Sequence, residues 1–383
     1  CTGIGKKSKV VYSILMKRSR VASISLGILA AIAVGVVLDL AQTVIIPLVI
    51  AILLSFILEP VISFLMKKLK FPRIIAIILV ILIIFGFFYL IGLFVYNSAQ
   101  SFVREYPNYL EKFQEIFQDL NQRYLGRLDI PDDLLAQIDW SDAIRESIVS
   151  WSGSFVGFLG VLFIILIFLF FLFLENPLFK RKLKAAFPLH TSRRIGIIME
   201  HIIRQVSRYL SVKFFISALT AFLIWLSLTI IDVDFPLIWA MLGFFLNFIP
   251  NIGSVIVSAI IIMVSIIQFY PAMGRVAAAA ACMITIQTVV GSILDPKLQG
   301  DRLNLSPVVI LFSLLFWGWL WGVVGAILSI PITATLKIIF ENVPPLKPVG
   351  VLMGTGHKMR RWHLFRKKKS GGREQPSSID ENR

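Results

Sequence analysis

Two predominantly apolar stretches near the C-terminus are too long for ordinary membrane-spanning helices, and this limits the possible folds more than any other feature. Residues 235–270 and 307–340 contain 36 and 34 residues respectively. At about 1.5 Å per residue, a straight helix of that length measures about 50 Å, whereas the hydrocarbon core of a bilayer is about 30 Å thick. Helix-breaking residues interrupt both stretches, as PNIG at 250–253 and GWLWG at 318–322. We therefore predict two helix–break–helix hairpins, which either span the membrane or re-enter it from one side.

The composition places the rest of the chain in a membrane as well. Of the 383 residues, 57% are hydrophobic and 16% are charged, and the mean hydropathy is +0.83. A soluble domain cannot bury that much apolar surface. We expect an all-α polytopic membrane protein with about five or six spanning helices and the two hairpins, which together make about eight helical segments in the membrane.

The positive charge is arranged in short blocks beside the apolar runs. The net charge is +16, and this pattern is typical of cytoplasmic loops rather than of a nucleic-acid-binding face. It predicts a basic cytoplasmic N-terminus, three transmembrane helices, an acidic extracytoplasmic helical segment, a fourth transmembrane helix, a basic cytoplasmic connector, a transport core and a basic, partly disordered cytoplasmic tail. These segments are residues 1–20, 21–96, 97–150, 153–174, 175–213, 214–341 and 342–383.

The acidic segment carries an apolar stripe. Apolar residues recur every three to four positions from Phe102 to Tyr124, which is the spacing of one face of a helix. Pro131 marks the start of a second short helix. The first helix could lie on the outer membrane surface or pack against its copies in an oligomer, and the sequence does not choose between these arrangements.

The residues of the first break have two interpretations. In lipid every backbone N–H and C=O must be paired, so a broken helix survives only where protein or a water-filled cavity covers it. The broken helices of transporters place polar backbone near the middle of the membrane, where it binds substrates or ions. Asn247, Pro250, Asn251 and Gly253 would then line a substrate path. The alternative is a tight turn between two ordinary helices at a membrane surface.

Three other polar residues within apolar runs also have two interpretations. Gln287 either joins helices by hydrogen bonds or contacts substrate. Glu59 either reaches the cytoplasmic interface or is a membrane-embedded acid that couples transport to an ion. Lys337 either extends its amine to the interface or pairs with a carboxylate.

Enzyme chemistry has no support in the sequence. We find no metal-ligand spacing, nucleophile elbow or phosphate-binding glycine-rich loop. We therefore expect no catalytic residues, no metal and no cofactor. Without a nucleotide-binding loop of its own, the chain would have to transport passively or by coupling to an ion.

Several motifs resemble one membrane-protein family. PNIGS at 250–254, DPKLQGDRLNLSPVVILFSLLFWGWLWGVVGAILSIP at 295–331 and ITATLKIIFE at 332–341 are similar to the signature of the autoinducer-2 exporter family, also called the predicted PurR-regulated permeases. FWGWLWG, and Asn247 upstream of PNIGS, resemble the branch that exports autoinducer-2. Many relatives carry Glu shortly before the position of Pro296, where this chain has Val290.

The resemblance implies a multi-pass exporter of the bacterial inner membrane, with the lipid bilayer and a small polar solute as partners. It also implies a homo-oligomer, with a pentamer as the candidate assembly, and hairpins that move as an elevator-like unit. Combined with the two breaks, it predicts a substrate site that uses backbone and amide groups of Asn247, Pro250, Asn251, Gly253, Gln287, Gly318, Gly322 and Gly325. The rival functions are a sodium(lithium)/proton antiporter, with Glu59 as the titratable acid, and a non-transporting membrane scaffold.

Overall fold

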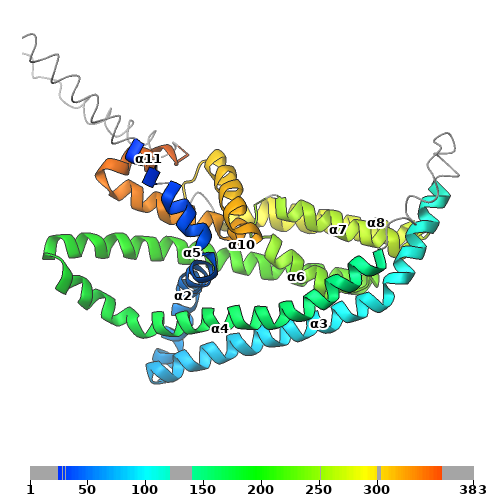
Figure 1. Cartoon of the computed structure of the whole chain (residues 1–383), viewed down its shortest axis with the longest axis horizontal. Helices are drawn as coiled ribbons and strands as arrows, with labels where there is room; N and C mark the ends of the chain where they lie inside the picture. The colour runs from blue at the N-terminus through cyan, green and yellow to red at the C-terminus, as the bar shows by residue number, and fades with distance from the viewer. Residues whose placement is uncertain are drawn as a thin grey trace, which may run out of the picture.

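A computed structural model describes residues 25–355, with gaps at 28, 31, 121–139, 251 and 300–302. All regular elements in these described ranges are helices, so the predicted all-α polytopic fold is confirmed. In chain order the helices shown in Figure 1 are Ser25–Leu40, α2 (Gln42–Lys68), α3 (Arg73–Leu120), α4 (Trp140–Ala186), α5 (Leu189–Ile231), α6 (Pro236–Leu246), α7 (Ile252–Phe269), α8 (Met273–Ile286), the π-helix η3 (Gln287–Leu294), α9 (Asp295–Gln299), α10 (Pro307–Asn342), the 3-10 helix η4 (Pro344–Leu346) and α11 (Lys347–Leu352).

Seven of the described helices are long and apolar enough to cross a membrane. Five of these candidates are α2, the first part of α3, the middle of α4, α5, and the composite helix formed by α8, η3 and α9. The other two are α7 and α10, which belong to the two long apolar stretches. Large apolar side chains such as Leu82, Phe163 and Phe215 remain exposed on these helices. Surface of this kind is expected where a helix faces lipid tails.

The helices pack around two separate apolar cores. The first lies between α2, α3 and α4, where Ala51 and Ala76 are fully buried and their small side chains let the helices approach closely. The second lies within α5 to η3 and contains Ile216, Ile261 and Met283. In Figure 1, α3 and α4 run side by side along one edge of the molecule, and a tight turn joins α4 to α5. The chain therefore forms two helical bodies, α2–α4 and α5–η3.

The two ends of the bundle differ in charge. One end, called the basic end below, carries the α2–α3 loop with Lys67 and Arg73 and the α4–α5 turn with Arg193 and Arg194 on either side of it. The opposite end, called the acidic end, carries the α5–α6 loop at 232–235.

The first long apolar stretch forms a hairpin that enters and returns at the acidic end. Its first arm, α6, has 11 residues and measures about 17 Å, so it is too short to cross a bilayer core of about 30 Å. The outer ends of the two arms are joined by Gln268, whose amide nitrogen donates to the carbonyl of Asp232 at 2.9 Å and whose amide oxygen accepts from the backbone N–H of Asp234 at 3.0 Å. We call α6, the break and α7 the first hairpin.

The second long stretch also folds back on itself, within α10. Trp321 and Gly322 leave the helical conformation, and Gly322 has φ of 62°, which favours glycine. The two arms on either side of this break are antiparallel, because the Ser313 hydroxyl donates to the carbonyl of Ser329 at 3.0 Å. Pro331 lies inside the second arm and does not interrupt it. We call α10 the second hairpin.

The second hairpin begins and ends at the basic end. Arg194, beside the α4–α5 turn, donates to the carbonyl of Asn342 at the end of α10 at 2.8 Å. At the start of α10, the N–H of Ser306 donates to the carbonyl of Met353 at 2.9 Å. Both long stretches are thus re-entrant, and they enter from opposite ends of the bundle.

Beyond its membrane part, α3 continues into the predicted acidic segment and contacts loops of its own chain. Three contacts hold it there. They are a hydrogen bond from Tyr109 to the carboxylate of Asp234, one from Lys112 to the carbonyl of Gln268 at 3.0 Å, and one from Tyr270 to the carboxylate of Asp119. Burial, and then the bond to Asp234, raises the pKa of the Tyr109 hydroxyl, so it stays protonated as a donor. This is a third arrangement beside the two that the sequence left open. The predicted second helix start at Pro131 lies outside the described residues.

Candidate functional site

One face of α5 carries polar groups through the second helical body. Tyr209, Lys213 and Ser217 follow one another at intervals of four residues, so they lie on one face of the helix. All three are buried. Ionisable and polar residues inside a membrane are costly unless paired, and they often mark the path of a substrate or an ion. This face, called the α5 polar face, is the starting point for the site.

The strongest feature of the α5 polar face is a buried ion pair. The Lys213 amine lies 2.9 Å from a carboxylate oxygen of Asp295, and their side chains are only 4% and 19% exposed. The amide nitrogen of Gln299, one turn further along α9, also donates to the Asp295 carboxylate. Pairing compensates the cost of removing both charges from water, and it ties α5 to α9.

The helix that leads to Asp295 has an irregular stretch. Residues Gln287–Leu294 form a π-helix, in which each hydrogen bond spans one residue more than in an α-helix. Such a stretch shifts the residues that follow it around the helix axis, and it is frequent at functional sites. Gln287 begins this segment and is half-buried, with its amide oxygen beside Gly291.

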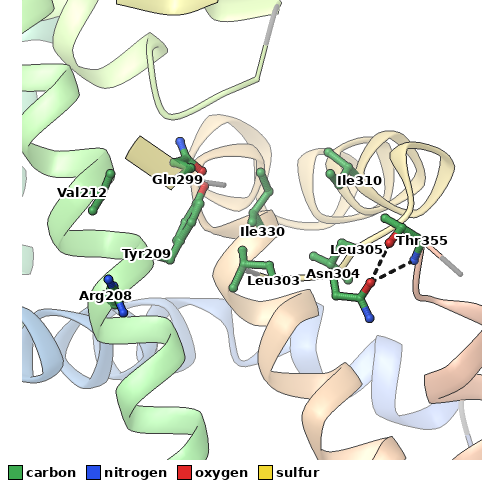
Figure 2. Close-up of a pocket in the computed structure, with 10 residues that line it drawn as sticks. All are labelled: Arg208, Tyr209, Val212, Gln299, Leu303, Asn304, Leu305, Ile310, Ile330 and Thr355. Carbon is green, nitrogen blue, oxygen red and sulfur yellow. Dashed lines mark hydrogen bonds between the residues drawn. The ribbon is translucent and has the colours of Figure 1, made fainter. Parts of the chain in front are cut away.

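A cavity of 160 Å³ opens beside the ion pair (Figure 2). It lies between α5, α9, the loop before α10, and both arms of the second hairpin. Its lining residues are Arg208, Tyr209, Val212, Gln299, Leu303, Asn304, Leu305, Ile310, Ile330 and Thr355. Figure 2 shows Tyr209 and Gln299 pointing toward one another on one side, and Asn304 and Thr355 on the other. We call this cavity the basic-end pocket.

The loop side of the pocket is held by side chains that bind backbone. Asn304 has a positive φ of 49°, and its amide oxygen accepts a hydrogen bond of 2.6 Å from the Thr355 hydroxyl. The buried Lys337 amine donates to the carbonyl of Asn304 at 2.8 Å and lies 3.4 Å from the carboxylate of Glu341. Lys337 therefore points inward and pairs with a carboxylate, which was one of its two predicted roles.

The residues of the first break lie next to the α5 polar face. The amide nitrogen of Asn247 donates to the Ser217 hydroxyl at 3.0 Å, and Asn247 is buried. Pro250 is half-buried in the turn, and Gly253 is buried where α7 begins. At Gly253 an added Cβ would lie 1.7 Å from the carbonyl oxygen of Leu246, so this glycine permits the two arms to meet. Asn251 lies outside the described residues.

The bond between Asn247 and Ser217 predicts an effect on stability. In Ser217→Ala the Asn247 amide would lose its buried partner, which costs about 1–3 kcal/mol. Ser258→Ala is the matched control, because the buried Ser258 hydroxyl has no partner among the described residues. We expect the first variant to unfold at a lower temperature in detergent and the control to unfold at the wild-type temperature or above it. Equal melting temperatures for both variants would contradict this role of Asn247.

The glycines of the second break shape the hairpin tip. Gly322 supplies the positive φ, and at Gly325 an added Cβ would lie 1.9 Å from the carbonyl oxygen of Trp317. Gly318 has only an ordinary contact at 3.7 Å. The indole nitrogen of Trp321 donates to the carbonyl of Leu38 at 3.1 Å, which anchors the tip to the N-terminal helix. Among the described residues, no hydrogen bond joins this tip to the first break.

The remaining predicted residue lies elsewhere. Glu59, on α2, accepts a hydrogen bond of 3.2 Å from the amide nitrogen of Asn176 on α4. It belongs to the first helical body and does not line the basic-end pocket. Its role in ion coupling remains a prediction.

Sequence reasoning missed the ion pair. It assigned Lys213 to the end of the basic connector and Asp295 to a loop, whereas the structure buries both. One signal was available, because each residue directly borders an apolar run and their charges are opposite. The pairing itself joins positions 82 residues apart, and a single sequence does not show such a contact.

Comparison with known proteins agrees with this membrane architecture. A family model described as AI-2E family transporter matches residues 26–344. A provisionally named transport protein of Borreliella burgdorferi is 35% identical over 257 residues, which cover 67% of this chain and 70% of the relative. A similarly named protein of Haemophilus influenzae is 32% identical over 296 residues, covering 76% of this chain and 84% of the relative. The AI-2 transport protein TqsA of Escherichia coli strain K12 is 29% identical over 295 residues, with coverage of 76% and 84%.

Proposed function

Because the chain belongs to the AI-2E family of transporters, we propose that it exports a small polar signalling molecule, autoinducer-2, across the bacterial inner membrane. The similarity to the AI-2 transport protein TqsA supports this substrate. The basic loops support an orientation with both termini in the cytoplasm, which places the basic-end pocket on the cytoplasmic side. The protein would act as a secondary transporter and a homo-oligomer, with the predicted pentamer still to be tested.

The observation that carries the proposal is the basic-end pocket beside a buried ion pair. Polar groups of α5 and α9 face a cavity whose other walls are apolar. This combination suits a small polar molecule that must be removed from water without losing its hydrogen bonds. The α5 polar face continues from the pocket through Lys213 to Ser217, where the tip of the first hairpin is attached.

The two helical bodies support a mechanism by relative movement. An apolar crevice of 510 Å³ lies between α3 and the α5–α6 part of the second body, and its lining includes Phe88, Ala221 and Phe244. A crevice of this kind leaves few polar contacts to break within the membrane when one body slides against the other. In the proposed cycle, the second body and the hairpins carry the solute from the basic end toward the acidic end.

Efflux from proteoliposomes tests the proposed function. The wild-type protein should release preloaded autoinducer-2 faster than empty liposomes do. Asn247→Leu should lower this rate about tenfold or more, because it removes the polar contact that fixes the first hairpin on α5. The same variant should insert and purify normally. Equal release by protein-containing and protein-free liposomes would reject the substrate, and proton movement driven by sodium in the same liposomes would favour the antiporter.

A further inference from the structure

We propose that the basic-end pocket binds a small hydroxylated anion with a single negative charge. Arg208 would be its charge partner, and the Tyr209 hydroxyl and the Gln299 amide oxygen would be its hydrogen-bond partners. The inference rests on the proposed transport function and specifies the substrate class.

The balance of charge around the pocket points to an anion. Lys213 is neutralised by Asp295 at 2.9 Å, and Lys337 has Glu341 at 3.4 Å. Arg208 lines the pocket and forms neither an ion pair nor a side-chain hydrogen bond with any residue in the described ranges. Three cations therefore face two carboxylates, which leaves one positive charge. A guanidinium is well suited to bind a carboxylate or another planar anion.

Tyr209 supplies a second and independent indication of a ligand. Its side chain is only 6% exposed, it lines the pocket, and its hydroxyl has no hydrogen-bond partner in the part of the chain that the structure describes. A buried hydroxyl without a partner is costly, and a bound ligand would remove this cost. Figure 2 shows the tyrosine ring directed toward Gln299 at the edge of the cavity.

Gln299 completes the polar wall. Its amide nitrogen is occupied by the Asp295 carboxylate, so the amide group is fixed in orientation. Its amide oxygen has no partner among the described residues and can accept a hydrogen bond from a ligand hydroxyl. Residues 301–302, which follow shortly after it and are not described, carry one negative and one positive formal charge, so they leave the balance unchanged.

The other walls and the volume limit the size of the ligand. Val212, Ile310 and Ile330 contribute apolar surface opposite the polar groups. A water molecule needs roughly 10–15 Å³ of such volume, so a cavity of 160 Å³ holds a ligand of about ten heavy atoms. The ligand class is thus a short organic anion with hydroxyl groups and one less polar face. An inside-negative membrane potential would drive such an anion outward.

A cysteine placed in the pocket measures its electrostatic potential directly. The reporter is Val212→Cys in a background with Cys1→Ser and Cys282→Ser, and Ile310→Cys on another wall serves as a second reporter. Each is reacted with methanethiosulfonates of opposite charge, and the ratio of the anionic to the cationic rate is recorded. We expect the anionic reagent to react faster in the otherwise wild-type pocket.

Two arginine variants decide whether Arg208 is the source of this preference. Arg208→Gln should lower the rate ratio on the order of tenfold, because a nearby unpaired charge acts with opposite sign on the two reagents. Arg204→Gln should leave it unchanged, because Arg204 is exposed one turn earlier on α5, pairs with Glu200 and does not line the pocket. An equal fall in both variants, or no preference in the first place, would overturn the proposal.

A matched pair of probes tests the ligand class with the same reporters. Ribonate and ribose have the same carbon number but differ in one negative charge. Ribonate should protect Val212→Cys from alkylation at millimolar concentration at least fivefold better than ribose, and Tyr209→Phe should weaken that protection. Equal protection, or none by either probe, counts against the anion site. If the reagents confirm the site and autoinducer-2 is not exported, the substrate assignment fails and the pocket proposal stands.

Discussion

Gly253→Ala and Gly325→Ala should each abolish transport, although each adds only one methyl group. The added Cβ would lie 1.7 Å from the carbonyl oxygen of Leu246 in the first case and 1.9 Å from that of Trp317 in the second. Backbone cannot move aside as a flexible side chain can, so each hairpin tip must open. We expect a cost on the order of 3 kcal/mol and a displaced tip. Efflux of autoinducer-2 from proteoliposomes should fall more than tenfold.

The chain offers matched controls for both glycines. Gly274→Ala, at the start of α8, has nothing within 4 Å of the new atom. Gly318→Ala, in the second hairpin, would make only an ordinary contact at 3.7 Å. Both should transport at the wild-type rate, since alanine also favours helix by about 1 kcal/mol over glycine. Normal efflux by Gly253→Ala or Gly325→Ala would show that the close approach of the arms is unnecessary.

The second large effect concerns the buried ion pair. Lys213→Met leaves the Asp295 carboxylate without its counter-ion, and Asp295→Asn leaves the lysine amine unpaired. Breaking a buried pair from one side costs about 3–5 kcal/mol. The double variant should recover most of this loss, because it leaves no charge to compensate. A double-mutant cycle of unfolding free energies in detergent micelles would measure the coupling between the two residues.

An exposed pair in the same chain serves as the reference. Lys182 and Glu175 also form an ion pair, but their side chains are 63% and 53% exposed. Replacing either should cost less than about 1 kcal/mol, because water screens the charges. If the Lys213 and Asp295 single variants were as stable as these, the pair would not be buried in the membrane as described.

The two hairpins could be predicted because one physical limit determines them. A stretch that is longer than the bilayer is thick and that contains Pro or Gly must bend, and both stretches do. The entry side was not predictable from length. It depends on contacts between distant residues, such as the bond from Arg194 to the carbonyl of Asn342 across 148 positions.

The predicted site residues divided according to what local sequence can show. Gly253, Gly322 and Gly325 were found because a break needs small residues, and the structure gives them a role in the backbone of the tips. Asn247 was found as a polar group in an apolar run, but its partner Ser217 was not visible. The basic-end pocket was missed because Tyr209 and Gln299 look like ordinary interfacial residues until α5 and α9 are placed together.

Sidedness of the loops tests most directly whether both hairpins re-enter the membrane from opposite ends. Single cysteines replace Leu69, Met273 and Val343 in the background without native cysteines, and all three positions are exposed. In oriented membrane vesicles, a membrane-impermeant thiol reagent should label Leu69→Cys and Val343→Cys from one side and Met273→Cys from the other. Labelling of Leu69→Cys and Val343→Cys from different sides would mean that one of the long stretches crosses the membrane, and the proposed path between the hairpins would be wrong.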